Sequence, residues 1–353
     1  MKKYFFLISV AALAMTACTN ESEEYVGSQE SREIAFTPIA QPTTRATAAI
    51  DGTTFPTDYN FYISAYAVDA AGDYFDKAEY TNESSNTWSG KDASNKQYWP
   101  LSPETLNFLA ITKAGSSTTT FGNAGANYAS KVVVNLADNR TAQHDLMYSY
   151  ARAEVTKSTN TLTYNGGSNV AMAFAHAQAW VNFTVTAANT ATAGAGIVVT
   201  GIKLKQAVYD GTATVTLANY NSKSSDLSAT LVWDGTAYSS ATKYDVDVPT
   251  NKGSFSNVAV NSTSEIAAGD GLMIVPNPNK TESVLDPSFT TFVVSYTLNG
   301  NNYTFEYTPT AAQKRMEPAH KYDFNITFTL TEIKVDATVT DWTDADYAVA
   351  IPN

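Results

Sequence analysis

Alternation of apolar and polar side chains with a period of two is the feature that most limits what this chain can fold into. Six segments show it, all rich in Val, Thr, Tyr and Phe: residues 59–66, 131–136, 179–185, 291–298, 321–330 and 333–339. Such segments are typical of half-buried β-strands, because successive side chains of a strand point to opposite faces of its sheet. Helical periodicity is hard to find beyond one short turn at residues 310–316. The sequence therefore predicts an all-β protein.

Length and turn signals divide the expected strands between two antiparallel β-sandwich domains in tandem. The chain has 353 residues, which is enough for two ordinary domains with their own cores. Asn299-Gly300 predicts a tight hairpin turn, since that dipeptide readily supplies the positive φ angles such a turn needs. Asn165-Gly166-Gly167 marks a second turn near the middle of the chain. We place the boundary there, with domains at residues 46–167 and 168–353.

The composition excludes several classes of function. Lys and Arg total 22 against 34 Asp and Glu, so the net charge of -12 leaves no basic surface for nucleic acid. A single Cys rules out a disulfide framework or a Cys-based metal cluster within one chain, and three His argue against a His-built site. Neither a phosphate loop nor a dinucleotide fingerprint is present. We expect a protein that is not an enzyme and has no cofactor, metal or nucleic-acid partner.

The first residues have the pattern of an export signal. Lys2 and Lys3 precede an apolar stretch that is shorter than a membrane-spanning helix, and small residues precede Cys18. This pattern resembles a lipobox, which implies a lipoprotein signal peptide over residues 1–17, lipidation of Cys18 and an anchor in the outer membrane. An ordinary secretory signal with an incidental Cys is the alternative. The acidic tract at residues 19–24 resembles a surface-export signal of Bacteroidetes lipoproteins, or is a solvated tether.

A short alternating strand and an exposed segment follow the tether. Ile34 and Phe36 share one face of the expected strand. Arg45 lies after it, among small polar residues that nothing can hold in a core, so the segment is expected to be easily cut. A cut between Arg45 and Ala46 would free residues 18–45, a tether and propeptide strand, from their covalent link to the rest.

The C-terminal residues form a second alternating segment, with Tyr347, Val349 and Ile351 on one face. A sandwich that loses one strand exposes unpaired backbone groups and empty side-chain pockets. The terminal strand of another copy can fill them, a mode of β-augmentation called donor-strand complementation. The contact is head to tail, so repetition builds an open filament. Residues 333–339 are a second candidate donor, and strands that simply complete their own sheets are the alternative.

The order of motifs along the chain resembles the fimbrillin-like family, the type V pilins of the Bacteroidales. The motifs are Ile34-Ala35-Phe36, Thr43-Thr44-Arg45-Ala46, Tyr98-Trp99-Pro100, His144-Asp145-Leu146, Phe174-Ala175-His176 and Val339-Thr340-Asp341-Trp342. The resemblance implies two transthyretin-like β-sandwich domains and a structural pilin of a surface fimbria that supports adhesion. It also implies cleavage by an Arg-specific protease at Arg45, with other copies or related pilins as partners.

Two other functions are left open by the sequence. A monomeric surface lipoprotein that binds glycan or protein would use Trp88, Tyr98 and Trp99 as an aromatic platform, although the sequence favours core or edge packing for these residues. An anchor subunit of the same pilus would keep its lipid on Cys18 and would not need the cut.

Two clusters of polar residues are assigned structural roles. His144 and Asp145 have no positioned nucleophile beside them, so a structural pair is favoured over a catalytic one. Asp341, Asp344 and Asp346 lack the spacing of an EF-hand, which favours a solvated acidic loop over a Ca²⁺ site.

Overall fold

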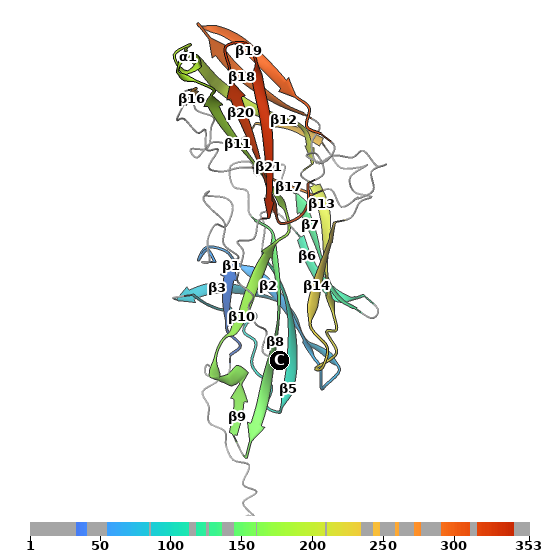
Figure 1. Cartoon of the computed structure of the whole chain (residues 1–353). Helices are drawn as coiled ribbons and strands as arrows, with labels where there is room; N and C mark the ends of the chain where they lie inside the picture. The colour runs from blue at the N-terminus through green and yellow to red at the C-terminus, as the bar shows by residue number, and fades with distance from the viewer. Residues whose placement is uncertain are drawn as a thin grey trace, which may run out of the picture. The chain divides into compact units, whose positions relative to one another are not determined.

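The computed structural model describes residues 33–40, 55–84, 86–112, 118–124, 127–135, 145–159, 161–208, 210–233, 243–247, 258–260, 272–276, 291–310 and 316–341. Most of these residues lie in strands, and the helical elements among them are one four-residue helix, α1 (Thr190–Ala193), and one 3₁₀ turn, η2 (Asn165–Gly167). The expected all-β class is therefore confirmed (Figure 1). The short helical turn expected at residues 310–316 falls largely outside the described residues.

The first half of the chain forms an eight-stranded sheet whose hydrogen-bonded ladder returns to its start. Its order is β10-β1-β4-β3-β2-β5-β8-β9, and β10 also pairs with β8. The strands are β1 (Phe36–Ala40), β2 (Phe61–Ala67), β3 (Gly72–Ser84), β4 (Thr87–Gly90), β5 (Glu104–Thr112), β8 (Met147–Ser158), β9 (Thr161–Tyr164) and β10 (Val170–His176). Because β10 pairs with β1 on one side and β8 on the other, β1 completes a closed circuit of strands.

Three smaller sheets hold the remaining strands. Their orders are β17-β11-β20-β21, β15-β12-β18-β19 with β16 on β12, and β14-β13-β7-β6. The strands are β6 (Thr118–Ala124), β7 (Asn127–Asn135), β11 (Ala179–Ala187), β12 (Ile197–Val208), β13 (Asp210–Ala218), β14 (Ser228–Trp233), β15 (Lys243–Asp247), β16 (Val258–Ala259), β17 (Leu272–Ile274), β18 (Thr291–Leu298), β19 (Asn301–Tyr307), β20 (His320–Phe328) and β21 (Ile333–Asp341).

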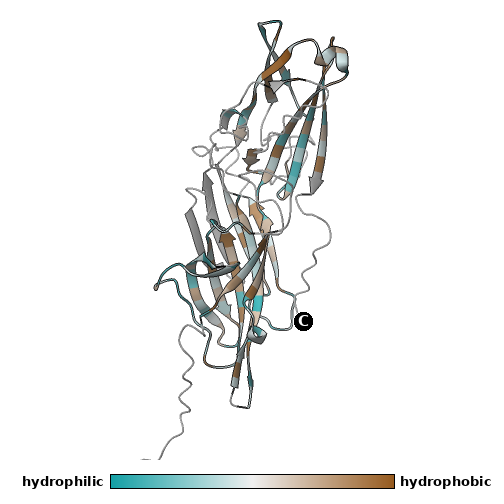
Figure 2. Cartoon of the chain, turned by 90° about the vertical axis from the view of Figure 1, so that its left-hand side faces the viewer, coloured by the Kyte–Doolittle hydropathy of each residue, from teal (hydrophilic) through white to brown (hydrophobic). Residues whose placement is uncertain are grey.

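Each of the six alternating segments of the sequence overlaps a strand, namely β2, β7, β11, β18, β20 or β21. Their alternation is that of half-buried strands, as β20 shows with its regular exchange of buried and half-buried residues. Figure 2 shows the same exchange of hydrophobic and hydrophilic residues along the strands. The expected hairpin is confirmed, because Asn299 and Gly300 have φ of 50° and 79° between β18 and β19.

Buried apolar side chains form two clusters. One gathers residues between Ile34 and Phe174, and the other consists of residues from Ala177 onward with four side chains from earlier in the chain. Strand pairing joins the two halves of the chain, because β13 pairs with β7 over eight residue pairs. The expected boundary between residues 167 and 168 therefore stays a prediction.

A buried polar pair lies where the chain passes from β10 to β11. His176 Nδ1 lies 2.7 Å from Asp145 Oδ2, and both side chains are fully buried. The backbone N–H of Asp145 donates to the Tyr59 hydroxyl at 3.1 Å, and burial, followed by the Asp145 carboxylate, raises the pKa of Tyr59. Asp145 thus has a structural role as the buried partner of His176, while His144 lies outside the described residues.

We expect His176→Ala to lower the free energy of unfolding by about 3 kcal/mol, because the buried Asp145 carboxylate loses its 2.7 Å partner. Urea unfolding followed by tryptophan fluorescence measures the change. The matched control is His320→Ala, since His320 is only half-buried and its Nδ1 contacts the Pro318 carbonyl at 2.8 Å. Equal losses in the two variants would contradict a special role for the buried pair.

Candidate functional site

β1 is inserted between two strands that hold it unequally. It runs parallel to β10 over five residue pairs, from Phe36 opposite Val170 to Ala40 opposite Phe174. On its other side it pairs with β4 at a single position, Phe36 opposite Trp88. Figure 1 shows β1 beside β10 within the eight-stranded sheet. The strand therefore has one strong edge and one weak edge.

The side chains of β1 and the residues just before it alternate between core and surface. Ile34 and Phe36 are fully buried, and the intervening Ala35 is half-buried. The Phe36 ring meets Tyr80 and Phe108 edge-on, with centroids 4.9 and 5.3 Å apart. Burial of each large apolar side chain contributes about 1.5–3 kcal/mol, so these two residues supply much of the attachment of the strand.

Pro38 lies on the weak edge of β1. The N–H of Val170 donates to the Ala35 carbonyl at 2.9 Å, so the backbone groups of Ala35 face β10. Backbone groups alternate sides along a strand, and those of Phe36 and Pro38 therefore face the β4 side. Proline has no N–H to donate, and here it lies beyond the single pairing of β1 with β4. The ladder with β10 is thus kept intact.

The start of the strand is fixed by a carboxylate. Glu33 Oε1 accepts a hydrogen bond from the Gly90 N–H at 3.1 Å, and its Oε2 lies 2.8 Å from Lys96 Nζ. Ile34 donates its N–H to the Gln97 carbonyl at 2.8 Å. The hydrogen bond and charge of Glu33 raise the pKa of Lys96, so the ammonium stays charged at neutral pH.

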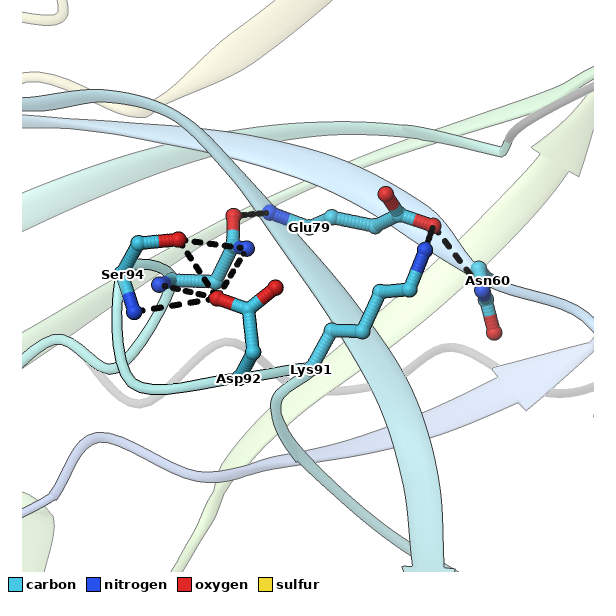
Figure 3. A network of polar contacts seen from close by, with 6 residues as sticks. Asn60, Glu79, Lys91, Asp92 and Ser94 are labelled. Atoms are coloured by element: carbon cyan, nitrogen blue, oxygen red, sulfur yellow. Dashed lines mark hydrogen bonds and ion pairs between the residues drawn. The ribbon is translucent and has the colours of Figure 1, made fainter.

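The loop that supplies Lys96 is braced by its own polar contacts. Asp92 Oδ1 accepts hydrogen bonds from both the backbone and the side chain of Ser94 and of Asn95, and these bonds lower the pKa of Asp92 (Figure 3). Asn95 Oδ1 accepts the Glu79 N–H at 2.7 Å, and Lys91 Nζ lies 3.0 Å from Glu79 Oε1. The loop is therefore tied to β3 independently of β1.

Gly90 allows the loop to fold back on the end of β4. A Cβ atom at Gly90 would lie 2.5 Å from Lys96 N and 2.7 Å from Asn95 O. Both are backbone atoms and have no flexible end that moves aside. The close approach explains why the N–H of Gly90 and the ammonium of Lys96 reach the same carboxylate.

Some of the site residues expected from the sequence lie within the described part of the chain and others lie outside it. Ile34 and Phe36 lie in the buried strand, whereas the following lie outside the described residues: Cys18, Arg45, Ala46, Tyr347, Val349 and Ile351. Sequence reasoning missed Gly90 and Lys96. The Ser-Gly-Lys-Asp run marks a turn, but it does not reveal that the turn meets Glu33.

Core packing, which the sequence favours over an aromatic platform, is confirmed for two of the three aromatic residues. Trp88 is fully buried and donates its Nε1–H to the Tyr59 carbonyl at 3.0 Å. Trp99 is 6% exposed and packs against Tyr164, while Tyr98 is partly exposed. The indole rings therefore serve the core, because a sugar ring needs an accessible aromatic face.

The part of the chain that the structure describes holds neither a metal-binding cluster nor a membrane-spanning helix. Within it, no three His, Cys, Asp or Glu side chains gather as a metal site would require. Among the same residues, none of the helices has the length and apolar character needed to span a membrane.

Comparison with known families identifies the chain. A family model described as fimbrillin-like matches residues 44–342. The chain belongs to the fimbrillin-like family. No curated protein matches this fimbrillin-like chain.

Solved structures similar to this fimbrillin-like chain come from related bacteria. They include a candidate cell adhesion protein from Bacteroides uniformis, at 16% identity, with a TM-score of 0.48, covering 88% of this chain and 99% of the other. A fimbrial protein from Bacteroides vulgatus has 15% identity and a TM-score of 0.47, covering 88% and 100%. A fimbrial assembly protein from Parabacteroides distasonis has 9% identity and a TM-score of 0.39, covering 87% and 98%.

We expect Gly90→Ala to destabilise the fimbrillin-like chain by about 1–3 kcal/mol, because the new methyl group forces the loop away from Glu33. Thermal unfolding measures the loss. Gly72→Ala is the matched control, since nothing lies within 4 Å of its Cβ position, and its effect stays within about 0.5 kcal/mol. A Gly90 variant as stable as the Gly72 variant would show that the close approach is dispensable.

Proposed function

We propose that this chain is a structural pilin of a surface fimbria that is cut after Arg45 and assembles by donor-strand exchange. The observation that carries the proposal is the burial of Ile34 and Phe36 on a strand that precedes the expected cut. Family membership supports a pilin-type role in adhesion. The eight residues 33–40 then act as a temporary plug of the sheet.

Both sides of the expected cut have a firm hold in the core. Phe36 lies before it, and Phe55 lies after it, fully buried with its ring 4.8 Å from that of Phe174. Cleavage after Arg45 therefore leaves the sheet anchored at Phe55 and turns β1 into a separate peptide. Such a peptide stays bound through its apolar side chains until a competitor displaces it.

Loss of β1 would open a groove that suits another strand. The N–H and C=O groups of β10 that pair with β1 would lose their partners, and the pockets of Ile34 and Phe36 would empty. An alternating apolar strand restores both kinds of contact. We propose the segment with Tyr347, Val349 and Ile351 of a second copy, or of a related pilin, as that strand.

The proposed maturation of the protein begins with export and lipidation. A signal peptide of residues 1–17 directs export, Cys18 carries lipid in the outer membrane, and an Arg-specific protease cuts between Arg45 and Ala46. The proposed domains are two transthyretin-like sandwiches at residues 46–167 and 168–353, and β10 of the second range then completes the sheet of the first. The product is a non-enzymatic subunit at the cell surface.

We expect Arg45→Ala to block assembly while leaving a folded, lipid-bearing precursor, because β1 keeps its covalent link. Surface fimbriae are counted by electron microscopy, and precursor size is measured by gel electrophoresis of unheated samples. Arg45→Lys is the matched control, since it keeps the charge but removes the site of an Arg-specific protease. Normal filaments from Arg45→Ala would overturn the proposed mechanism, and a lipid-bearing N-terminus at Cys18 on assembled wild-type protein would favour an anchor subunit.

Phe36→Ala should affect the uncut precursor and the assembled form differently. In the uncut precursor it removes a buried ring, and we expect a loss of about 3–5 kcal/mol in the free energy of unfolding. In the assembled form β1 has left, so the heat stability of wild-type and variant oligomers should agree. Urea unfolding of the precursor and heating of isolated oligomers measure the two effects. Equal destabilisation of both forms would show that β1 stays in place.

A further inference from the structure

Glu33 lies in a built carboxylate site at the entrance of the groove. Its side chain is 9% exposed and is held from two directions, by the Gly90 N–H at 3.1 Å and by Lys96 Nζ at 2.8 Å. The backbone of both donor residues is positioned without help from β1, because Gly90 pairs with Tyr80 of β3 and the Lys96 N–H donates to the Asp92 carbonyl at 3.1 Å. The site would therefore outlast the departure of the strand.

The proposed donor segment repeats the chemical pattern of the plug. The plug reads Glu33-Ile34-Ala35-Phe36-Thr37-Pro38, and the C-terminal segment reads Asp346-Tyr347-Ala348-Val349-Ala350-Ile351. Each begins with an acid, and an apolar side chain follows at every second position. In the plug the apolar positions face the core and the acid lies on the outer face.

We propose that Gly90 and Lys96 form a carboxylate receptor that holds Glu33 in the precursor and Asp346 of a second copy after strand exchange. This inference rests on the proposed donor-strand mechanism and adds what sets the direction and register of the incoming strand. Asp346 occupies the place of Glu33, so the donor runs parallel to β10, as β1 does. A strand inserted in the opposite direction would bring its acid to the far end of the groove.

A charged contact is needed to fix the register of the donor strand, because the apolar pattern alone does not define it. A slip of two residues keeps every side chain on its face of the sheet. With Asp346 in the receptor, Tyr347 takes the place of Ile34 and Val349 that of Phe36. With Asp344 there instead, Ala345 would take the place of the fully buried Ile34 and leave a cavity.

The favoured register has one cost. Pro352 takes the place of Ile39, whose backbone faces β10 as that of Ala35 does. The exchanged strand therefore has one ladder hydrogen bond fewer than β1, near the end of the groove. A cavity at the place of Ile34 would lie among fully buried side chains, and we rank it as the larger loss.

The test is a charge exchange in the full chain carrying Cys18→Ser, cut with an Arg-specific protease. Lys96→Glu or Asp346→Lys alone should reduce the heat-sensitive oligomer ladder at least about tenfold, because like charges meet at the receptor. The double variant Lys96→Glu/Asp346→Lys should restore it to within about twofold, because opposite charges meet again.

Two control variants match the charge changes. Lys91→Glu alters the same loop, but Lys91 pairs with Glu79, so assembly should stay at the wild-type level. Asp344→Lys places its charge two residues away and should also leave assembly unchanged. Loss of the ladder in Asp344→Lys but not in Asp346→Lys would overturn the assigned register.

Disulfide cross-linking reads the register directly, since the chain with Cys18→Ser has no other cysteine. Thr37 lies opposite Ala171, which is exposed, so Ala350 of the donor should lie there. Ala171→Cys/Ala350→Cys should give covalent ladders, and Ala171→Cys/Ala348→Cys should not. A cross-link through residue 348, or oligomers that are insensitive to Asp346→Lys, would overturn the proposed carboxylate receptor but not strand exchange. A wild-type chain that forms no oligomers after the cut would overturn both the donor-strand mechanism and the receptor.

Discussion

Closure of the eight-stranded ladder depends on one strand of five residues. β1 lies between β10 and β4, and the only other link of β10 to this sheet is its two-pair contact with β8. The side chains of Ile34 and Phe36 are fully buried and belong to the apolar cluster of this sheet. Without β1 the ladder has a gap and the core has an opening at the same place.

The attachments of β1 explain how a strand can be both structural and removable. Its apolar side chains and its ladder with β10 make it a full member of the sheet. On the other side β1 pairs with β4 at a single position and Pro38 lies beyond that pairing. The remaining contacts on that side come from Glu33 and Ile34, just before the strand. The proposed strand exchange has use for such a strand, because the same groove would be filled in the precursor and reopened for assembly.

Local sequence pattern predicted the strands well, because alternation reports directly on which face of a strand is buried. It identified β2, β11, β18, β20 and β21, as well as the buried face of Ile34 and Phe36. It did not predict that β1 would run parallel to β10 or that β13 would pair with β7, since pairing between distant segments leaves no local signal.

The role of side chains in tertiary contacts was harder to foresee. Trp88 and Trp99 have the composition of a binding surface, but only the fold shows that they are buried. Gly90 and Lys96 look like ordinary turn residues, and their importance arises because β1 brings Glu33 beside them. Carboxylate recognition of this kind depends on three backbone segments and cannot be read from any one of them.

The distance in sequence between Phe36 and Val170 has a kinetic consequence. β1 leaves the ribosome early, but its main partner is made only after most of the first core, so the ladder closes late and through a non-local contact. During that interval the groove accepts any suitable strand. The native strand β1 occupies the groove in preference to other strands because its covalent tether gives it a high effective concentration, which no second chain matches in dilute solution. The proposed cleavage after Arg45 would remove this advantage without changing any contact of β1, and occupancy of the groove would then depend on the concentrations and affinities of the competing strands.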